Sequence, residues 1–172
     1  MKKALFILSI ITSLSTNTSA QVNPHAIGVR LGGGSFGSGA EISYQHGLGE
    51  ANRLEIDLGW STYKANNGFG KDSYKHYTHT FLTGIYHWDW NLVSSLNWYV
   101  GPGAQLGFYQ DRYDDNNDGI TLSLGGQIGI EYDFNELGAP ILLALDMRPM
   151  WGFLGGTSGA GYGAALSVRY IF

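Results

Sequence analysis

The amino-acid sequence predicts an all-β protein, an eight-stranded antiparallel up-and-down transmembrane β-barrel. Three observations lead to this fold class. In residues 120–134 the even positions are apolar apart from one glycine, and the odd positions are polar or glycine. Alternation over 15 residues exceeds the usual soluble strand of about five or six residues and suffices for a tilted strand across a bilayer, which needs about 9–11. Seven further segments repeat the pattern, so the strands can close without a free edge in lipid.

The first 20 residues predict a signal peptide. Lys2 and Lys3 form a basic start after Met1, residues 4–11 form an apolar run too short to span a membrane as a helix, and Thr18-Ser19-Ala20 is a small-residue cleavage site. We therefore expect residues 21–172 to form the barrel as one domain, with a retained N-terminal anchor as the alternative. No later apolar run approaches 18 residues, so no transmembrane helix is expected.

The composition of the chain suits a barrel with an apolar wall. Aromatic residues make up 14% of the sequence and charged residues only 14%, and there are 26 glycines and no cysteine. Without disulfides, the fold depends on hydrogen bonding and packing. The formal charge is −4, and removal of Lys2 and Lys3 with the signal peptide makes it −6. This acidic balance argues against nucleic acid as a partner.

The first three predicted strands place apolar residues on one face and charged or small residues on the other. They span residues 26–34, 39–46 and 53–63. Their apolar faces contain Ile27, Val29, Leu31, Ala40, Ile42, Tyr44, Leu54, Ile56, Leu58 and Trp60. Residues 35–38 and 47–52 are short connections, whereas residues 64–75 are a longer polar loop with Asn66-Asn67-Gly68 as turn chemistry.

The fourth predicted strand, residues 76–88, fits two registers. If its odd positions face outward, Tyr77, Phe81 and Ile85 are exposed together with His79 and His87. If its even positions face outward, Leu82, Tyr86 and Trp88 are exposed. A bulge could combine the two, and the alternation alone leaves the choice open.

The last four strands are predicted at residues 96–109, 120–134, 141–151 and 162–172. Pro102 interrupts the first of them and predicts a bulge or kink, because proline cannot donate to a ladder. The second, fourth and sixth connections are short, and most of the odd-numbered ones are longer loops. In outer-membrane barrels the turns are periplasmic and the loops extracellular. Aromatic residues near the strand ends, among them Trp60, Trp88, Trp98, Phe108 and Trp151, are typical of the girdles at the two membrane interfaces.

The inward faces of the predicted strands carry four cations and six anions. An eight-stranded barrel has room only for side chains inside, and buried charges persist when they are paired. We therefore predict a charge network that fills the lumen rather than an ion path. Its expected members are Arg30, Glu41, Arg53, Glu55, Asp57, Glu131, Asp133, Asp146, Arg148 and Arg169.

Two further motifs carry weaker predictions. Asp114, Asn116 and Asp118, followed by Gly119, match the first half of a calcium loop, but Gly125 stands where the closing acid is needed. We interpret this segment as an acidic loop tip and keep weak cation binding as a hypothesis. His76 and His79 are three residues apart, so on a strand they point to opposite faces and share no metal. No cofactor is expected.

The chain ends on Leu166, Val168, Tyr170 and Phe172, with an aromatic residue in the final position. This end resembles the signal that outer-membrane barrels present to the barrel-assembly machinery, carried here by Tyr170 and Phe172. The mature chain is similar to the small outer-membrane β-barrel family that includes OmpX and the OmpA membrane domain. The resemblance is architectural and implies structural, adhesive or host-contact roles, with no catalytic residue to carry over.

The sequence therefore predicts a monomeric, non-enzymatic outer-membrane barrel without an open pore. Its expected partners are outer-membrane lipid, lipopolysaccharide and the assembly machinery. One alternative is a lipid-A-modifying enzyme, which needs a serine, a histidine and a carboxylate in a geometry that no sequence shows. A less favoured alternative is a secreted lipocalin-like barrel, whose apolar face would point inward.

Overall fold

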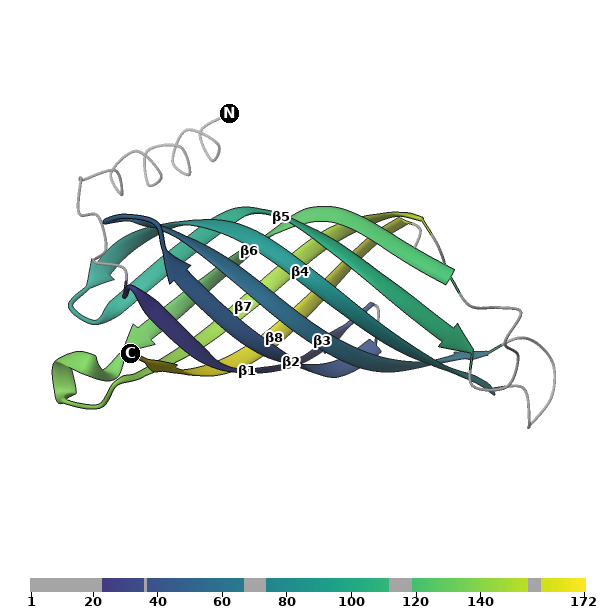
Figure 1. Cartoon of the computed structure of the whole chain (residues 1–172), viewed down its shortest axis with the longest axis horizontal. Coiled ribbons are helices and arrows are strands. Elements are labelled where there is room, and N and C mark those ends of the chain that lie inside the picture. Colours follow the sequence, from purple (N-terminus) through teal and green to yellow (C-terminus); the bar gives the residue numbers. More distant parts are fainter. Residues whose placement is uncertain (1–22, 36, 67–73, 112–118, 155–158) are drawn as a thin grey trace, which may run out of the picture.

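The computed structural model describes residues 23–35, 37–66, 74–111, 119–154 and 159–172. Within these residues the chain forms eight antiparallel strands that close into one barrel (Figure 1). The strands are β1 (His25–Gly34), β2 (Gly37–Gly47), β3 (Asn52–Asn66), β4 (Tyr74–Val93), β5 (Leu96–Asp111), β6 (Gly119–Asp133), β7 (Ile141–Leu154) and β8 (Gly159–Ile171). The predicted fold class is confirmed. The predicted signal peptide, residues 1–20, lies outside the described residues.

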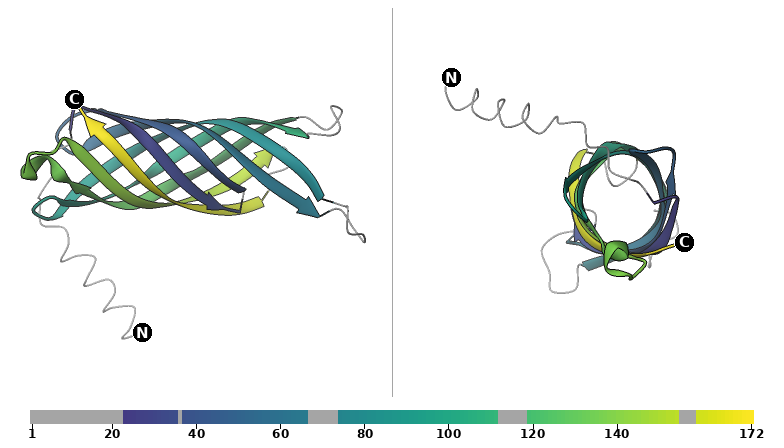
Figure 2. Two further views of the ribbon diagram at one scale, coloured as in Figure 1. Left: turned by 90° about the horizontal axis from the view of Figure 1, so that it is seen from below. Right: turned by 90° about the vertical axis from the view of Figure 1, so that its left-hand side faces the viewer.

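The barrel closes between its first and last strands. β1 pairs with β2 on one side and with β8 on the other, in a ladder that runs from Ala26 opposite Ile171 to Gly34 opposite Gly163. Beyond this ladder the amide of Phe172 donates to the carbonyl of His25 at 3.1 Å. The end-on view in Figure 2 shows the resulting ring of strands.

The two ends of the barrel differ in their connections. Residues 48–51, residues 94–95 and the segment between β6 and β7 lie at one end, together with Asn23 and Phe172; we refer to it as the turn end. In Figure 1 it is the end that carries the label C. The opposite end, where β3 meets β4 and β5 meets β6, is the loop end.

The β6–β7 connection at the turn end contains a short 3₁₀ helix, η2 (Phe134–Leu137). Asp133 caps it by accepting a hydrogen bond from the amide of Asn135. Gly138 ends it at a φ of 81°, a left-handed conformation that favours glycine. Among the described residues no helix is long and apolar enough to cross a bilayer.

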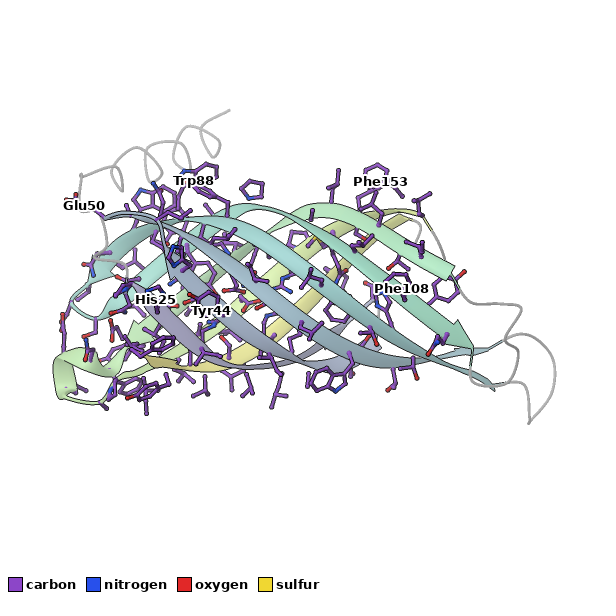
Figure 3. All side chains as sticks on the ribbon, in the orientation of Figure 1. His25, Tyr44, Glu50, Trp88, Phe108 and Phe153 are labelled. Atoms are coloured by element: carbon purple, nitrogen blue, oxygen red, sulfur yellow. The ribbon has the colours of Figure 1, made fainter. Side chains whose placement is uncertain are left out.

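The wall of the barrel is apolar outside and polar inside (Figure 3). Ile128 and Leu145 are 47% and 54% exposed on the outer face, whereas Glu55 and Arg169 are 0% and 1% exposed inside. The outer face also carries Ile27, Val29, Leu31, Ile42, Leu58, Leu82, Leu106, Leu124, Ile130, Leu166 and Val168. A water-soluble barrel has the reverse polarity. The apolar outer face therefore suits the hydrocarbon interior of a membrane.

The structure decides the register of β4 in favour of outward even positions. Leu82 and Trp88 are exposed, whereas Phe81 and Ile85 lie inside at 8% and 1% exposure, with His79 and His87 beside them. Phe81 fits because glycines stand opposite it on both neighbouring strands, Gly59 on β3 and Gly107 on β5. A Cβ atom on Gly59 would come within 2.4 Å of the Phe81 ring. In the β4–β5 ladder a register shift occurs near the turn, between Asn91 and Val93.

Of the bulge or kink predicted at Pro102, the bulge is wrong. Pro102 stands opposite Gly126 in an unshifted ladder between β5 and β6. On the β4 side the pairs on either side of Pro102, Ile85 with Gly103 and Trp88 with Val100, keep the same register. Proline therefore removes a donor without adding a residue to the strand.

The outer wall generates a test of the hydrocarbon environment. Ile128→Arg, near the middle of β6, is expected to lower the free energy of unfolding by about 2–4 kcal/mol, because a cation is costly on the lipid face at mid-depth. Urea unfolding of the protein in phospholipid vesicles measures this change. Leu137→Arg, in the exposed η2 helix, is the matched control and should have little effect. Equal effects of both substitutions would contradict a lipid-facing β6.

Candidate functional site

The interior of the barrel collects charged side chains from seven of the described strands. Arginines come from β1, β3, β7 and β8, and carboxylates come from β2, β3, β4, β6 and β7. Each reaches the lumen because period-two alternation sends every second side chain inward. The ion-paired members, which we call the lumen network, are Arg30, Glu41, Arg53, Glu55, Asp57, Asp89, Glu131, Asp146, Arg148 and Arg169.

Arg148 is the most connected member of the lumen network. Its Nη1 donates to Glu41 at 2.8 Å, and its Nη2 donates to Asp57 at 2.5 Å and to Glu55 at 3.2 Å. Its Nε donates to the amide oxygen of Gln127 at 3.2 Å. The side chain is only 5% exposed. One guanidinium therefore joins β7 to β2, β3 and β6 across the lumen.

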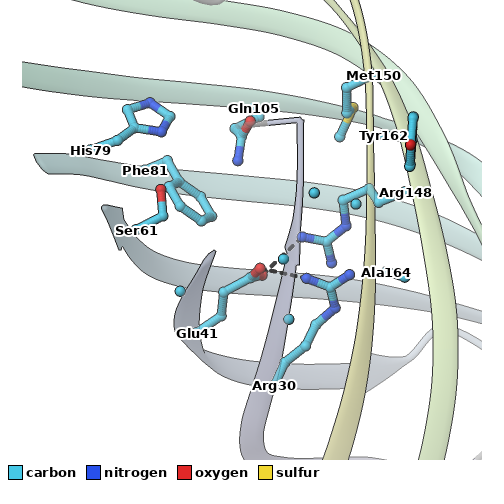
Figure 4. A pocket seen from close by; sticks show the side chains of 15 residues that line it. Arg30, Glu41, Ser61, His79, Phe81, Gln105, Arg148, Met150, Tyr162 and Ala164 are labelled. Atoms are coloured by element: carbon cyan, nitrogen blue, oxygen red, sulfur yellow. Dashed lines mark hydrogen bonds and ion pairs between the residues drawn. The ribbon is translucent and has the colours of Figure 1, made fainter. Parts of the chain in front are cut away.

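Glu41 extends the lumen network to β1. Its second oxygen accepts from Arg30, which faces it in the β1–β2 ladder, and Figure 4 shows both arginines converging on this carboxylate. Arg30 also donates to Asp146 at 2.5 Å through Nη2. Each planar guanidinium thus uses its fork of donors for two or more carboxylates.

Glu55 joins Arg148 to Arg169. Arg169 donates to Glu55 at 2.9 Å, and its other donors bind the hydroxyls of Ser43 at 3.0 Å and Ser167 at 2.9 Å. Both Arg169 and Glu55 have side chains that are 0% exposed. This full burial is tolerated because the charges are paired and hydrogen-bonded.

Arg53 forms the part of the lumen network nearest the turn end. It donates to Glu131 at 2.8 Å and lies 3.1 Å from Asp89. Its guanidinium carbon lies 4.6 Å from the ring centroid of Tyr99, a cation–π contact. Tyr99 itself lies over Gly129, where a Cβ atom would come within 2.5 Å of the ring.

The structure brings together nine of the ten charged residues expected in the lumen. Asp133 is the exception, because it caps η2 at the turn end and accepts from Asn23 at 2.8 Å. Asp89 stands in the lumen network, and the sequence missed it because the register of the fourth strand was open. With the even positions of the fourth strand facing outward, the alternation places Asp89 on the inward face.

The other predicted site residues lie elsewhere. Tyr170 and Phe172 are on the outer wall at the turn end, 56% and 60% exposed. Asp114, Asn116 and Asp118 lie outside the described residues. His79 points into the lumen, where its Nε2 lies 2.8 Å from the Thr121 hydroxyl; the side chain of His76 is not among those described. Within the described part of the chain, no three histidines and carboxylates group as a metal site.

A cavity lies on each side of the lumen network, one toward the loop end and one at the turn end. The one toward the loop end has a volume of about 80 Å³ and has Arg30, Glu41 and Arg148 at its base, with His79, Gln105 and Tyr162 on its walls (Figure 4). The other, at the turn end, measures about 290 Å³ and is lined by amides, hydroxyls and the carboxylates of Asp133 and Glu136. Charged side chains occupy the barrel between them.

The lumen network generates a stability prediction. Arg148→Ala should lower the free energy of unfolding by about 3–5 kcal/mol, because it leaves three buried carboxylates without their shared cation. Urea unfolding measures the loss. The double variant Arg148→Ala/Asp57→Asn should recover part of it, since one uncompensated charge is removed. An unchanged urea midpoint for Arg148→Ala would refute the structural role of the lumen network.

Glu136 generates a pH prediction at the turn end. Hydrogen bonds from Ser95 and Ser94 hold the pKa of the Glu136 carboxyl below its ordinary value. The attachment of η2 to the β4–β5 turn is therefore present above about pH 4.3 and is lost as the pH falls through the lowered pKa. Amide chemical shifts of Ser94 and Ser95 in micelles should follow this titration. Glu136→Gln should abolish it, and a midpoint above the ordinary glutamate value would contradict the contact.

No protein-family model matches the sequence, and no curated protein matches it. The structure is similar to solved small barrels. Neisserial surface protein A shares 15% identity over 86% of this chain and 96% of its own, with a TM-score of 0.60. The attachment invasion locus protein Ail of Yersinia pestis shares 9% identity over 86% and 96%, with a TM-score of 0.52. The N-terminal β-barrel domain of Pseudomonas aeruginosa OprF shares 18% identity over 88% and 100%, with a TM-score of 0.50.

At these identities the likeness concerns the fold. It agrees with the resemblance to OmpX and the OmpA membrane domain that the C-terminal residues and the strand pattern indicated. The chain has the fold of the small eight-stranded outer-membrane β-barrels.

Proposed function

We propose that this protein is an integral outer-membrane barrel with a structural or surface-interaction role and no open pore. The observation that carries the proposal is the polarity of the closed wall. Leucine, isoleucine and valine side chains cover its outside, while four arginines and six carboxylates are paired inside. A closed barrel of this polarity is stable in a bilayer and would expose its apolar surface in water.

The absence of a pore is proposed from the filled lumen. Eight strands enclose little more than the volume of their own inward side chains. Here Arg148 reaches carboxylates on two strands, and Arg169, Arg53 and Tyr99 occupy the layers nearer the turn end. An ion that crossed the barrel would have to break several buried ion pairs at once, which is costly.

The apolar outer wall and the C-terminal residues of the barrel indicate which partners it meets. We propose outer-membrane lipid and lipopolysaccharide as partners of the apolar wall. We further propose that the barrel-assembly machinery recognises Tyr170 and Phe172. The chain would reach the membrane through its signal peptide and remain a monomer. The names of two structural neighbours, a surface protein and an attachment invasion protein, support a surface-interaction role.

The lipocalin-like alternative is wrong, because its apolar face points into the barrel and here that face points outward. The lipid-A-modifying alternative stays a prediction. Mass spectra of lipid A from cells with and without the protein test it, and an altered acyl pattern would replace the present proposal by an enzymatic one.

The proposal is tested by fractionation and conductance. The protein should appear in the outer-membrane fraction and change its gel mobility on boiling, because a closed barrel resists detergent until heated. In planar bilayers it should give no sustained conductance. Recovery from the soluble periplasm without a mobility shift would overturn the location, and stable single-channel steps would overturn the closed lumen.

A further inference from the structure

Two histidines face each other on the outer wall at the turn end. His25 begins β1, His46 lies near the end of β2, and the two residues are partners in the β1–β2 ladder. Their rings are 5.0 Å apart between centroids, and their Nδ1 atoms are 3.3 Å apart. Although 21 residues separate them in the chain, the ladder places them side by side.

Two aromatic side chains complete this group, which we call the histidine pair site. The Tyr44 hydroxyl lies 2.9 Å from Nδ1 of His25. The ring of Phe172, the last residue of the chain, stacks on the His25 ring at 5.5 Å and 21°. Figure 3 shows His25 and Tyr44 near each other toward the turn end. Both histidines and Tyr44 are half-buried, and they lie at the turn end beside the last residue of the chain.

We propose that the histidine pair site binds one divalent transition metal ion of the zinc class through Nδ1 of His25 and Nδ1 of His46. Zinc binds imidazole nitrogen at about 2.0–2.1 Å, and two such ligands on a tetrahedral ion stand about 3.3–3.4 Å apart. The observed separation of 3.3 Å matches this value. It is long for a direct hydrogen bond, which usually spans about 2.7–3.2 Å.

The surrounding groups define which metal fits. Imidazole nitrogen suits zinc, copper and nickel, whereas calcium and magnesium require several oxygen ligands. The sequence contains no cysteine, so thiolate chemistry is absent. The Tyr44 oxygen lies 2.9 Å from His25 Nδ1 as a third donor. Water can fill the remaining positions because the site lies at the end of the barrel, where the membrane meets water.

A metal ion here would act beside the seam at which β1 pairs with β8 and the barrel closes. It would hold the first residue of β1 to β2, while the His25 ring packs on Phe172 and its carbonyl accepts from the Phe172 amide. Because the folded ladder is needed to bring the two nitrogens together, the metal binds the folded state and stabilises it by mass action.

The first experiment is calorimetric titration of zinc chloride into the refolded mature protein in detergent micelles, prepared without a polyhistidine tag. We expect one zinc ion per chain, with affinity reduced about tenfold or more by His25→Ala or His46→Ala. The double variant should bind no better than either single variant.

Two phenol variants provide matched controls. Tyr44→Phe removes the hydroxyl beside the proposed site and should weaken binding. Tyr132→Phe removes a phenol from an outward ring near the turn end, packed on Phe134 at 4.7 Å, and should leave zinc affinity unchanged. The heat-dependent gel shift confirms that every variant is folded before titration.

A second measurement identifies the ligands directly. Electron paramagnetic resonance of the copper(II)-loaded protein should show nitrogen couplings from two imidazoles, reduced to one in His46→Ala. Absence of zinc binding by the folded protein would overturn the proposal. So would equal affinity in the double histidine variant, or copper bound by fewer than two imidazoles.

Discussion

Closure of the backbone hydrogen-bond ladder is the constraint on which the whole structure depends. In hydrocarbon an unpaired amide or carbonyl has no water to bind, so an open sheet edge is excluded. The seam between β1 and β8 removes the last edge. Here the ladder closes with eight antiparallel strands, so β1 begins and β8 ends at the same end of the barrel. Pro102 shows how strict the constraint is, because its missing donor is accommodated without any shift of register.

The small diameter of an eight-stranded barrel also restricts which side chains can fill its interior. Inward side chains meet across a few ångströms, and any charge among them must find its partner there. Arg148, Glu41 and Glu55 meet this requirement by sharing partners, so that each ion contacts more than one opposite charge. A large aromatic ring in the lumen needs a residue without a side chain on the strand opposite it. Tyr99 and Phe81 occupy the lumen because Gly129 and Gly59 leave the space opposite them.

The turn end combines packing, capping and ligand chemistry in a small region. Asp133 caps η2 and holds Asn23, Glu136 ties η2 to the β4–β5 turn, and Phe172 packs on His25. These contacts bring the first and last described residues together with two turns. The histidine pair site joins β1 to β2 next to the seam, whereas the ion pairs of the lumen network connect strands in the middle of the barrel.

The sequence by itself determined the strand pattern, the strand number, the apolar outer face and most of the lumen charges, because a period of two depends only on local alternation. It did not determine the register of β4, since Phe81 and Ile85 compete with Leu82 and Trp88 for the outer face and only glycines on the neighbouring strands decide. Asp133 continues the inward alternation of β6, but the chain turns into η2 there and uses the carboxylate as a cap. The meeting of His25 with His46 required the register of the β1–β2 ladder. Tertiary structure decided these points because cross-strand contacts depend on where each turn falls and on how the barrel closes, which no single segment encodes.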